Sequence, residues 1–167
     1  EAAQRHAEAH AATTGATLIH PFDDPRVIAG QGTMALEILE QAPELDTIVV
    51  PVGGGGLLAG VITVVKALRP DVRVIAVEPE AAAGFRAAWR HGAPVVESPG
   101  RTLADGLAVA RVGARTFALA ASGVDDVVTV TESELGAALA LLARTCGAVV
   151  EGAGAAAGSA TKPMRCS

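Results

Sequence analysis

Short β-branched runs alternate with longer mixed stretches along the chain, and this alternation predicts strands and helices in turn. The runs at residues 48–50, 72–77 and 127–130 are typical of buried parallel strands, and residues 16–19 fit a further short strand. Alanine-rich or amphipathic stretches predict helices over residues 1–14, 25–41, 57–68, 80–91, 113–121 and 131–146. Strands that alternate with helices of this length predict an α/β fold built on a parallel sheet.

Local signals mark where several of these helices begin and end. Asp24 before Pro25 is typical of an N-cap followed by proline in the first turn, and Gly15 is typical of a C-cap. Residues 131–134, Thr-Glu-Ser-Glu, predict a capping box. Residues 30–32, Gly-Gln-Gly, are costly inside a helix, so we expect another part of the chain to approach the backbone there.

Four consecutive glycines stand between the first long apolar strand and the helix that follows it. They are Gly53, Gly54, Gly55 and Gly56, and Leu57 begins the helical pattern. Because glycine has no Cβ, the backbone N–H groups can crowd around an oxyanion, and a helix N-terminus adds the positive end of its dipole. A flexible linker is the alternative, but linkers are seldom enclosed by two apolar runs. The loop therefore predicts a ligand that carries a phosphate.

Composition narrows the classes of protein that fit. Half of the 167 residues are hydrophobic and only 2% are aromatic, so the core is built from Ala, Val, Leu and Ile. A net charge of −5 argues against a nucleic-acid surface, and no apolar run is long enough for a membrane span. The chain does not open with a signal peptide, and its two cysteines lack a framework spacing, which favours the cytoplasm. Cys146 is predicted to be a small core residue rather than a ligand or nucleophile.

Two kinds of phosphate ligand agree with the glycine loop. In a dinucleotide site, Gly54, Gly56 and Ala59 would complete the pattern G-x-G-x-x-G/A, and Glu78 would meet a ribose at the end of the next strand. That pattern is weakly specific, and Glu78 could simply end a strand. The other candidate is pyridoxal 5'-phosphate, and further motifs bear on it.

Six motifs follow one another along the chain at plausible spacing. They are His-Pro-Phe-Asp-Asp-Pro at 20–25, Gly-Gln-Gly-Thr at 30–33, Val-Pro-Val-Gly-Gly-Gly-Gly-Leu at 50–57, Val-Glu-Pro-Glu at 77–80, Ala-Asp-Gly at 104–106 and Val-Glu-Gly-Ala-Gly at 150–154. In this order they resemble the threonine dehydratase and serine racemase family of fold-type-II pyridoxal phosphate enzymes. The resemblance covers residues 1–157. It implies a three-layer open parallel sheet with flanking helices, similar to the tryptophan synthase β fold but incomplete.

The resemblance also implies a set of cofactor contacts. The glycine loop would hold the phosphate through Gly53 to Gly56 and the amide of Leu57, as the backbone chemistry requires independently. Glu151 would lie by the cofactor ring, and Asp105 and Gly106 would lie close to the site. Some members bind a divalent cation, and the matching positions are Glu78 through its carboxylate and Ala82 through its carbonyl. The third ligand position falls on Gly84, which leaves a poor donor set for a cation.

The family's chemistry requires a Schiff-base lysine, and neither lysine of this chain matches its segment. Lys66 lies about 15 Å along the helix from the phosphate end at a rise of about 1.5 Å per residue, and Lys162 lies in the tail. We therefore expect the lysine outside this chain, which would be a C-terminal portion of the catalytic domain. Residues 1–20 would end the smaller domain as a helix and a strand, residues 21–157 would form part of the larger cofactor-binding domain, and residues 158–167 would be a divergent tail. Cys166 and Ser167 are not assigned to the pyridine nitrogen.

The function implied by the resemblance is that of an ammonia-lyase in the parent protein. It would convert L-threonine or L-serine to a 2-oxo acid and ammonia, with a homo-oligomeric assembly and no nucleic-acid or membrane partner. Serine racemase activity begins with the same removal of the α-proton, so it stays an alternative. A non-catalytic fragment that retains phosphate affinity is a third possibility, and this chain alone is expected to be inactive.

Overall fold

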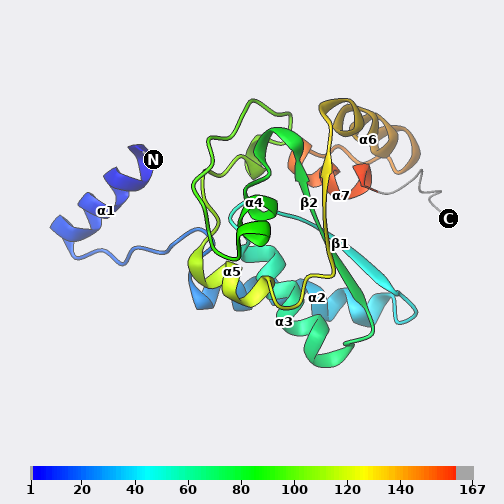
Figure 1. The fold of residues 1–167 in the computed structure, drawn as a ribbon, viewed down its shortest axis with the longest axis horizontal. Coiled ribbons are helices and arrows are strands. Elements are labelled where there is room, and N and C mark those ends of the chain that lie inside the picture. The colour runs from blue at the N-terminus through cyan, green and yellow to red at the C-terminus, as the bar shows by residue number, and fades with distance from the viewer. Residues whose placement is uncertain (1, 161–167) are drawn as a thin grey trace.

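Three parallel strands form the centre of the computed structural model, which describes residues 2–160 (Figure 1). They are β1 (Thr47–Pro51), β2 (Arg73–Pro79) and β3 (Asp126–Val130), in the order β1-β2-β3. Val49 pairs with Ile75, and Val77 pairs with Val128, so all three strands end at the same edge. The predicted strands near residues 48, 72 and 127 are confirmed, as is the parallel sheet.

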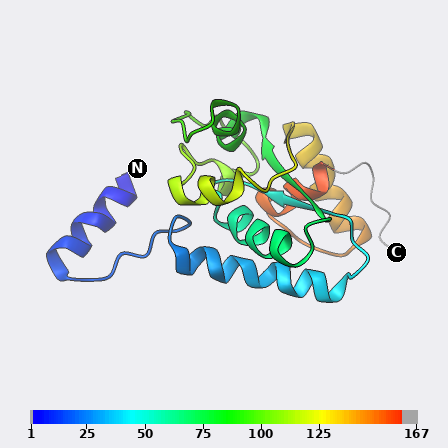
Figure 2. The same ribbon diagram turned by 60° about the horizontal axis from the view of Figure 1, so that its bottom comes forward.

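Helices cover both faces of this sheet and make the three layers. The helices of the described chain are α1 (Ala2–Thr14), α2 (Pro25–Gln41), α3 (Gly56–Leu68), α4 (Gly84–His91), α5 (Ala114–Ala120), α6 (Glu132–Thr145) and α7 (Gly152–Ser159), with 3₁₀ turns η1 (Glu80–Ala82) and η2 (Asp105–Leu107). Helix α1 does not belong to these layers. One core cluster joins the sheet to α2, α3, α4 and α5, and a second joins it to α6, α7 and η2. Figure 2 shows α2 and α3 side by side beneath the sheet.

The expected helix caps are present. The Asp24 carboxylate accepts the backbone N–H of Arg26 at 2.8 Å, and Pro25 occupies the first turn of α2. Thr131 and Glu134 form the capping box of α6, with each side chain accepting the backbone N–H of the other residue. Gly15 ends α1 with φ of 73°. These caps depend on neighbouring residues, which is why the sequence predicts them.

The glycines inside α2 allow α3 to approach its backbone, as expected. A Cβ on Gly60 of α3 would lie 2.6 Å from the backbone nitrogen of Gly32 and 2.6 Å from the carbonyl oxygen of Ile28. Such distances exclude any side chain at residue 60 unless the helices move apart. Gly30 has open space around it, so only Gly32 is explained by this contact.

Three features differ from the predictions. Residues 16–19 form no strand in the described chain, because an isolated extended segment gains no ladder hydrogen bonds without a partner strand. The helix predicted over residues 80–91 is divided at Ala83 into η1 and α4. Cys146 is exposed at the C-terminal end of α6, so the prediction of a core residue is wrong. Lys162, Cys166 and Ser167 lie outside the described residues.

Helix α1 lies apart from the rest of the chain in both ribbon views, at the end of an extended stretch that leads to α2 (Figures 1 and 2). Within residues 2–160, none of the helices has both the length and the apolar character needed to cross a membrane.

Candidate functional site

The glycine loop connects the end of β1 to the start of α3. The Val52 N–H donates to the Val77 carbonyl at 2.9 Å, which extends the sheet pairing to the edge of the loop. Gly55 has φ of 89° and precedes the first residue of α3, Gly56. Among residues 2–160, no hydrogen bond uses the amides of Gly54, Gly55, Gly56 or Leu57 as donors. The loop therefore presents unpaired N–H groups at a helix N-terminus, as an anion site does.

Two of these glycines are required by their surroundings. A Cβ on Gly54 would overlap the ring of Phe22, which packs directly against the loop. A Cβ on Gly55 would lie 2.9 Å from the Thr116 hydroxyl, and its positive φ is unfavourable for other residues. The close packing behind the loop explains why several glycines stand together here.

An open cleft of about 580 Å³ lies in front of the loop. Residues from the linker, α2, the loop, η2 and α7 line it, namely Pro21, Phe22, Val27, Gln31, Pro51, Gly53, Gly54, Gly55, Gly56, Leu57, Gly106, Leu107, Val109, Glu151, Ala153 and Gly154. The structure thus brings the predicted loop residues together with Gly106 and Glu151. Asp105 is exposed and does not line this cleft.

Glu151 reaches the cleft at the N-terminus of α7. Its carboxylate accepts the backbone N–H groups of Ala153 at 2.8 Å and Gly154 at 2.7 Å, so it is the N-cap of that helix. A Cβ on Gly152 would overlap the carbonyl of Leu103, which keeps α7 close to the segment before η2. The motif at residues 151–154 therefore combines a capping acid with a close backbone contact.

Glu78 lies away from this cleft, at the end of β2. Its side chain is fully buried, and its carboxylate accepts the backbone N–H of Phe85 at 2.7 Å and of Arg86 at 2.8 Å. Burial raises the pKa of Glu78 to about 7, against the lowering effect of these two hydrogen bonds and of the Arg86 charge. A ribose-binding role in a dinucleotide site needs a carboxylate at the cleft, and Glu78 is not there.

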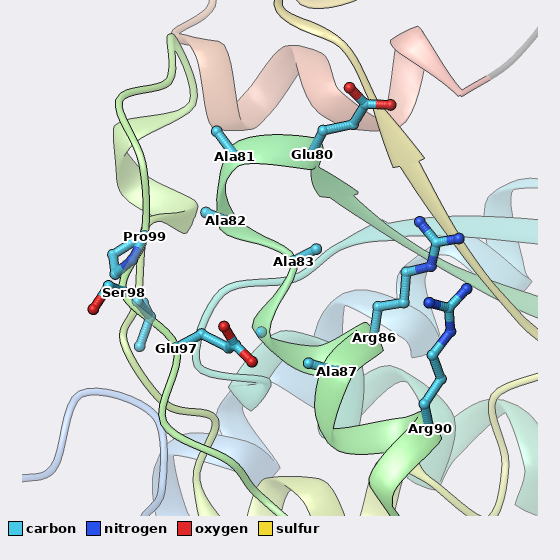
Figure 3. Close-up of a pocket in the computed structure, with 12 residues that line it drawn as sticks. Glu80, Ala81, Ala82, Ala83, Arg86, Ala87, Arg90, Glu97, Ser98 and Pro99 are labelled. Atoms are coloured by element: carbon cyan, nitrogen blue, oxygen red, sulfur yellow. The ribbon is translucent and has the colours of Figure 1, made fainter.

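The positions considered for a cation lie around the turn after β2. Figure 3 shows Ala82 and its neighbours beside a separate pocket of about 370 Å³, with Arg86 and Arg90 on α4 and Glu97 on the opposite segment. Gly84 lines this pocket, whereas the Glu78 carboxylate is turned to the start of α4. No group of three His, Cys, Asp or Glu side chains in the described chain is arranged for a metal ion. A cation at Glu78 and Ala82 stays a prediction.

Lys66 lies on α3 away from the cleft. Its Nζ donates to the carbonyl of Val72 at 2.8 Å and to Asp125 Oδ2 at 2.7 Å, which joins α3 to the residues that directly precede β2 and β3. These contacts give Lys66 a structural role, and it does not line the cleft.

Several residues at the loop carry no signal in the sequence that assigns them to the site. Phe22 and Gln31 line the cleft, and both stand inside motifs that carried the resemblance. Thr116 and Asp23 lie behind the loop, where Thr116 Oγ1 donates to the Gly54 carbonyl and Asp23 caps the start of α5. These two contacts span more than 60 residues of sequence, and no local pattern reveals them.

Comparisons with known proteins agree with this geometry. A family described as pyridoxal-phosphate dependent enzymes matches residues 1–165. The L-threonine ammonia-lyase of Thermotoga maritima is 46% identical over 142 residues, which are 85% of this chain and 35% of that protein. The biosynthetic L-threonine dehydratase of Escherichia coli is 48% identical over 143 residues, 86% of this chain and 28% of that protein.

Solved structures show the same relationship. The threonine deaminase of T.th. has a TM-score of 0.89 and 46% identity, and the match covers 92% of this chain and 57% of that chain. The serine racemase of Dictyostelium discoideum has a TM-score of 0.87 and 37% identity, covering 94% of this chain and 50% of that chain. The chain spans between 28% and 57% of the length of these relatives. By sequence and by structure, it belongs to the family of pyridoxal-phosphate dependent enzymes.

Proposed function

We propose that the glycine loop binds the phosphate of pyridoxal 5'-phosphate and that the parent protein is a threonine or serine ammonia-lyase. The observation that carries the proposal is the set of unpaired amides at residues 54–57, which face a cleft at the N-terminus of α3. Backbone N–H groups and a helix dipole favour a dianion without a cationic side chain. The donor set of the loop therefore fits a phosphate monoester.

The other residues of the cleft would place the rest of the cofactor. The loop and Leu57 line the cleft, and so does Glu151, whose carboxylate is held by the start of α7. When bound, the cofactor supplies an electron sink for the carbon from which the α-proton is removed. We assign the anchoring lysine to a part of the protein outside these 167 residues, because Lys66 is engaged with Asp125 and no other described residue is a lysine.

The reaction proposed for the parent protein removes the α-proton and the β-hydroxyl of L-threonine or L-serine as water. Hydrolysis of the resulting imine then takes up one water and releases the 2-oxo acid and ammonia. Several relatives bear the name of threonine ammonia-lyase or dehydratase, which supports this choice. Racemisation of serine is the second candidate, and the likeness to two serine racemase structures favours it. Both reactions begin with removal of the α-proton. The described residues do not distinguish one reaction from the other.

The domain division and setting are proposed with the same function. Residues 1–20 belong to the smaller domain and residues 21–157 to the larger, and the separation of α1 from the rest of the chain supports this division (Figure 1). We infer a homo-oligomeric parent protein that acts in the cytoplasm on a small amino acid, without nucleic acid or membrane.

Binding of pyridoxal 5'-phosphate to this chain tests the proposal. We expect saturable binding, followed by ³¹P nuclear magnetic resonance and competed by inorganic phosphate. Gly55→Ala should weaken it at least about tenfold, since a Cβ at positive φ costs about 1–2 kcal/mol and meets Thr116. Gly136→Ala is the matched control, because open space surrounds Gly136 on α6.

Two results would contradict the proposal. One is equal affinity in the wild-type chain and Gly55→Ala. The other is NADH binding with no response to pyridoxal 5'-phosphate, which would favour a dinucleotide site. A covalent adduct of pyridoxal 5'-phosphate on Lys66 after borohydride reduction would contradict only the assignment of the anchoring lysine.

A further inference from the structure

The carbonyl of Gly54 is held by α5 and by the residue that precedes this helix. Thr116 Oγ1 donates to it at 2.7 Å, and the Gly113 N–H donates to it at 3.2 Å. Thr116 is fully buried, so water does not compete for this carbonyl. The hydroxyl also lies 3.1 Å from the Gly113 carbonyl, but its one proton is best placed for the shorter contact with Gly54.

Holding this carbonyl has a consequence for the next amide. The Gly54 C=O and the Gly55 N–H belong to one peptide unit, which is trans and planar. The two groups therefore point in opposite directions. Because Thr116 fixes the C=O toward α5, it aims the Gly55 N–H away from α5, toward the cleft.

Asp23 keeps Thr116 in this place. Its Oδ1 accepts the backbone N–H groups of Arg115 and Thr116, both at 2.9 Å, and so caps the start of α5. The Asp23 N–H in turn donates to His20 Nδ1 at 2.9 Å. The linker that carries α1 is thereby connected through Asp23 and Thr116 to Gly54.

We propose that Thr116 is a positioning residue of the phosphate loop and that Asp23 connects its position to the linker between α1 and α2. The inference rests on the proposed phosphate-binding role of the loop. Neither side chain lines the cleft, so both act through the backbone of Gly54 rather than by touching the ligand.

Three variants test the role of the hydroxyl. Thr116→Val removes the donor but keeps the shape, and Thr116→Ser keeps the donor. Thr63→Val removes a bond of the same length, 2.7 Å, from the exposed Thr63 to Ala59 within α3. We expect Thr116→Val to weaken the binding of inorganic phosphate and of pyridoxal 5'-phosphate about tenfold, which is the effect of one lost hydrogen bond. Thr116→Ser and Thr63→Val should stay within about twofold of wild type on the same scale.

The ligand-free chain provides a second readout, because the proposal concerns the loop itself. The ¹H–¹⁵N signal of Gly55 should shift or broaden in Thr116→Val and keep its position in Thr116→Ser. Asp23→Ala should disturb the same signal, while Asp23→Asn, which retains Oδ1, should disturb it less.

The outcomes separate this inference from the proposed function. An unchanged Gly55 signal in Thr116→Val overturns the inference whether or not any ligand binds, and so does equal weakening in Thr116→Val and Thr116→Ser. A wild-type chain that binds neither inorganic phosphate nor pyridoxal 5'-phosphate overturns the proposed function. If the Gly55 signal of that chain still depends on the Thr116 hydroxyl, the positioning role of Thr116 in the loop is supported all the same.

Discussion

The ends of β1 and β2 lie side by side in the sheet, and each leads toward a helix N-terminus, but the two N-termini differ in whether a protein side chain accepts from their amides. After β1, the amides of the glycine loop have no partner among residues 2–160 and face a cleft. After β2, the amides of Phe85 and Arg86 at the start of α4 donate to the buried carboxylate of Glu78. One N-terminus is open to an anion from solution, and the other is occupied by a carboxyl group of the protein itself.

The difference shows what distinguishes a binding site from a cap. Both N-termini offer the same N–H groups and the same dipole. Glu151 at the start of α7 is an intermediate case, since it caps its helix but remains exposed at the cleft. A helix N-terminus becomes a candidate ligand site when the fold leaves its donors unpaired and accessible.

Removing the buried carboxyl group of Glu78 should have the largest effect. Glu78→Ala leaves the Phe85 and Arg86 amides without an acceptor and creates a cavity, so we expect a loss of about 4 kcal/mol in the free energy of unfolding. Urea denaturation at pH 7 measures it. Glu80→Ala, two residues along the chain and exposed, should change stability by less than about 0.5 kcal/mol. Equal effects of the two variants would contradict the role assigned to Glu78.

The protonation of Glu78 should make stability depend on pH. Because the folded pKa is raised from 4.5 to about 7, the folded chain binds a proton that the unfolded chain releases in this window. The free energy of unfolding therefore falls as pH rises from 4.5 to about 7, by roughly 3 kcal/mol at most. The difference in stability between wild type and Glu78→Gln isolates this contribution. A difference that stays flat across the window would show that the pKa is not raised.

Only the open N-terminus should respond to added anion. If phosphate binds with a dissociation constant of about 1 mM, 10 mM phosphate should raise the free energy of unfolding by about 1.4 kcal/mol. Thermal unfolding should show this gain in the wild-type chain and in Glu78→Gln, whose loop is intact. Gly55→Ala should show a smaller gain, and a matched ionic strength of sodium chloride should show none. Equal stabilisation of all three chains would place the anion elsewhere.

The exposed cap at α7 should give the smallest effect. Glu151→Ala removes an N-cap that water can partly replace, so we expect a loss of about 1 kcal/mol. Glu151→Asn retains a capping oxygen and should recover most of it. Urea denaturation of the two variants measures the difference. A loss as large as that of Glu78→Ala would show that burial does not distinguish the two capping acids.

Features formed by neighbouring residues could be predicted from the sequence. The strand, glycines and helix at residues 47–68 are consecutive, and so are the caps at Asp24 and Thr131. The loop residues, Gly106 and Glu151 could be brought together only because six motifs resembled one family.

Features formed between distant residues could not be predicted. The contact of Thr116 with Gly54 joins residues 62 apart, and that of Asp23 with Thr116 joins residues 93 apart. After the break at Ala83, the carboxylate of Glu78 accepts from the first amides of α4, and it does not line the cleft. Cysteine is a residue type that is usually buried, but Cys146 lies at the end of α6 and is exposed to solvent. In each of these cases, tertiary packing and not local sequence preference determines the structure.

The contact between Gly60 and Gly32 also sets a dimension of the cleft. Gln31, beside Gly32 on α2, lines one wall, and Gly56 at the start of α3 belongs to another. Since α2 and α3 meet backbone to backbone, no rotamer change can draw these walls closer together. A rigid helix pair therefore defines the lower limit of this opening, and the size of the molecule that enters it depends on two residues that never touch that molecule.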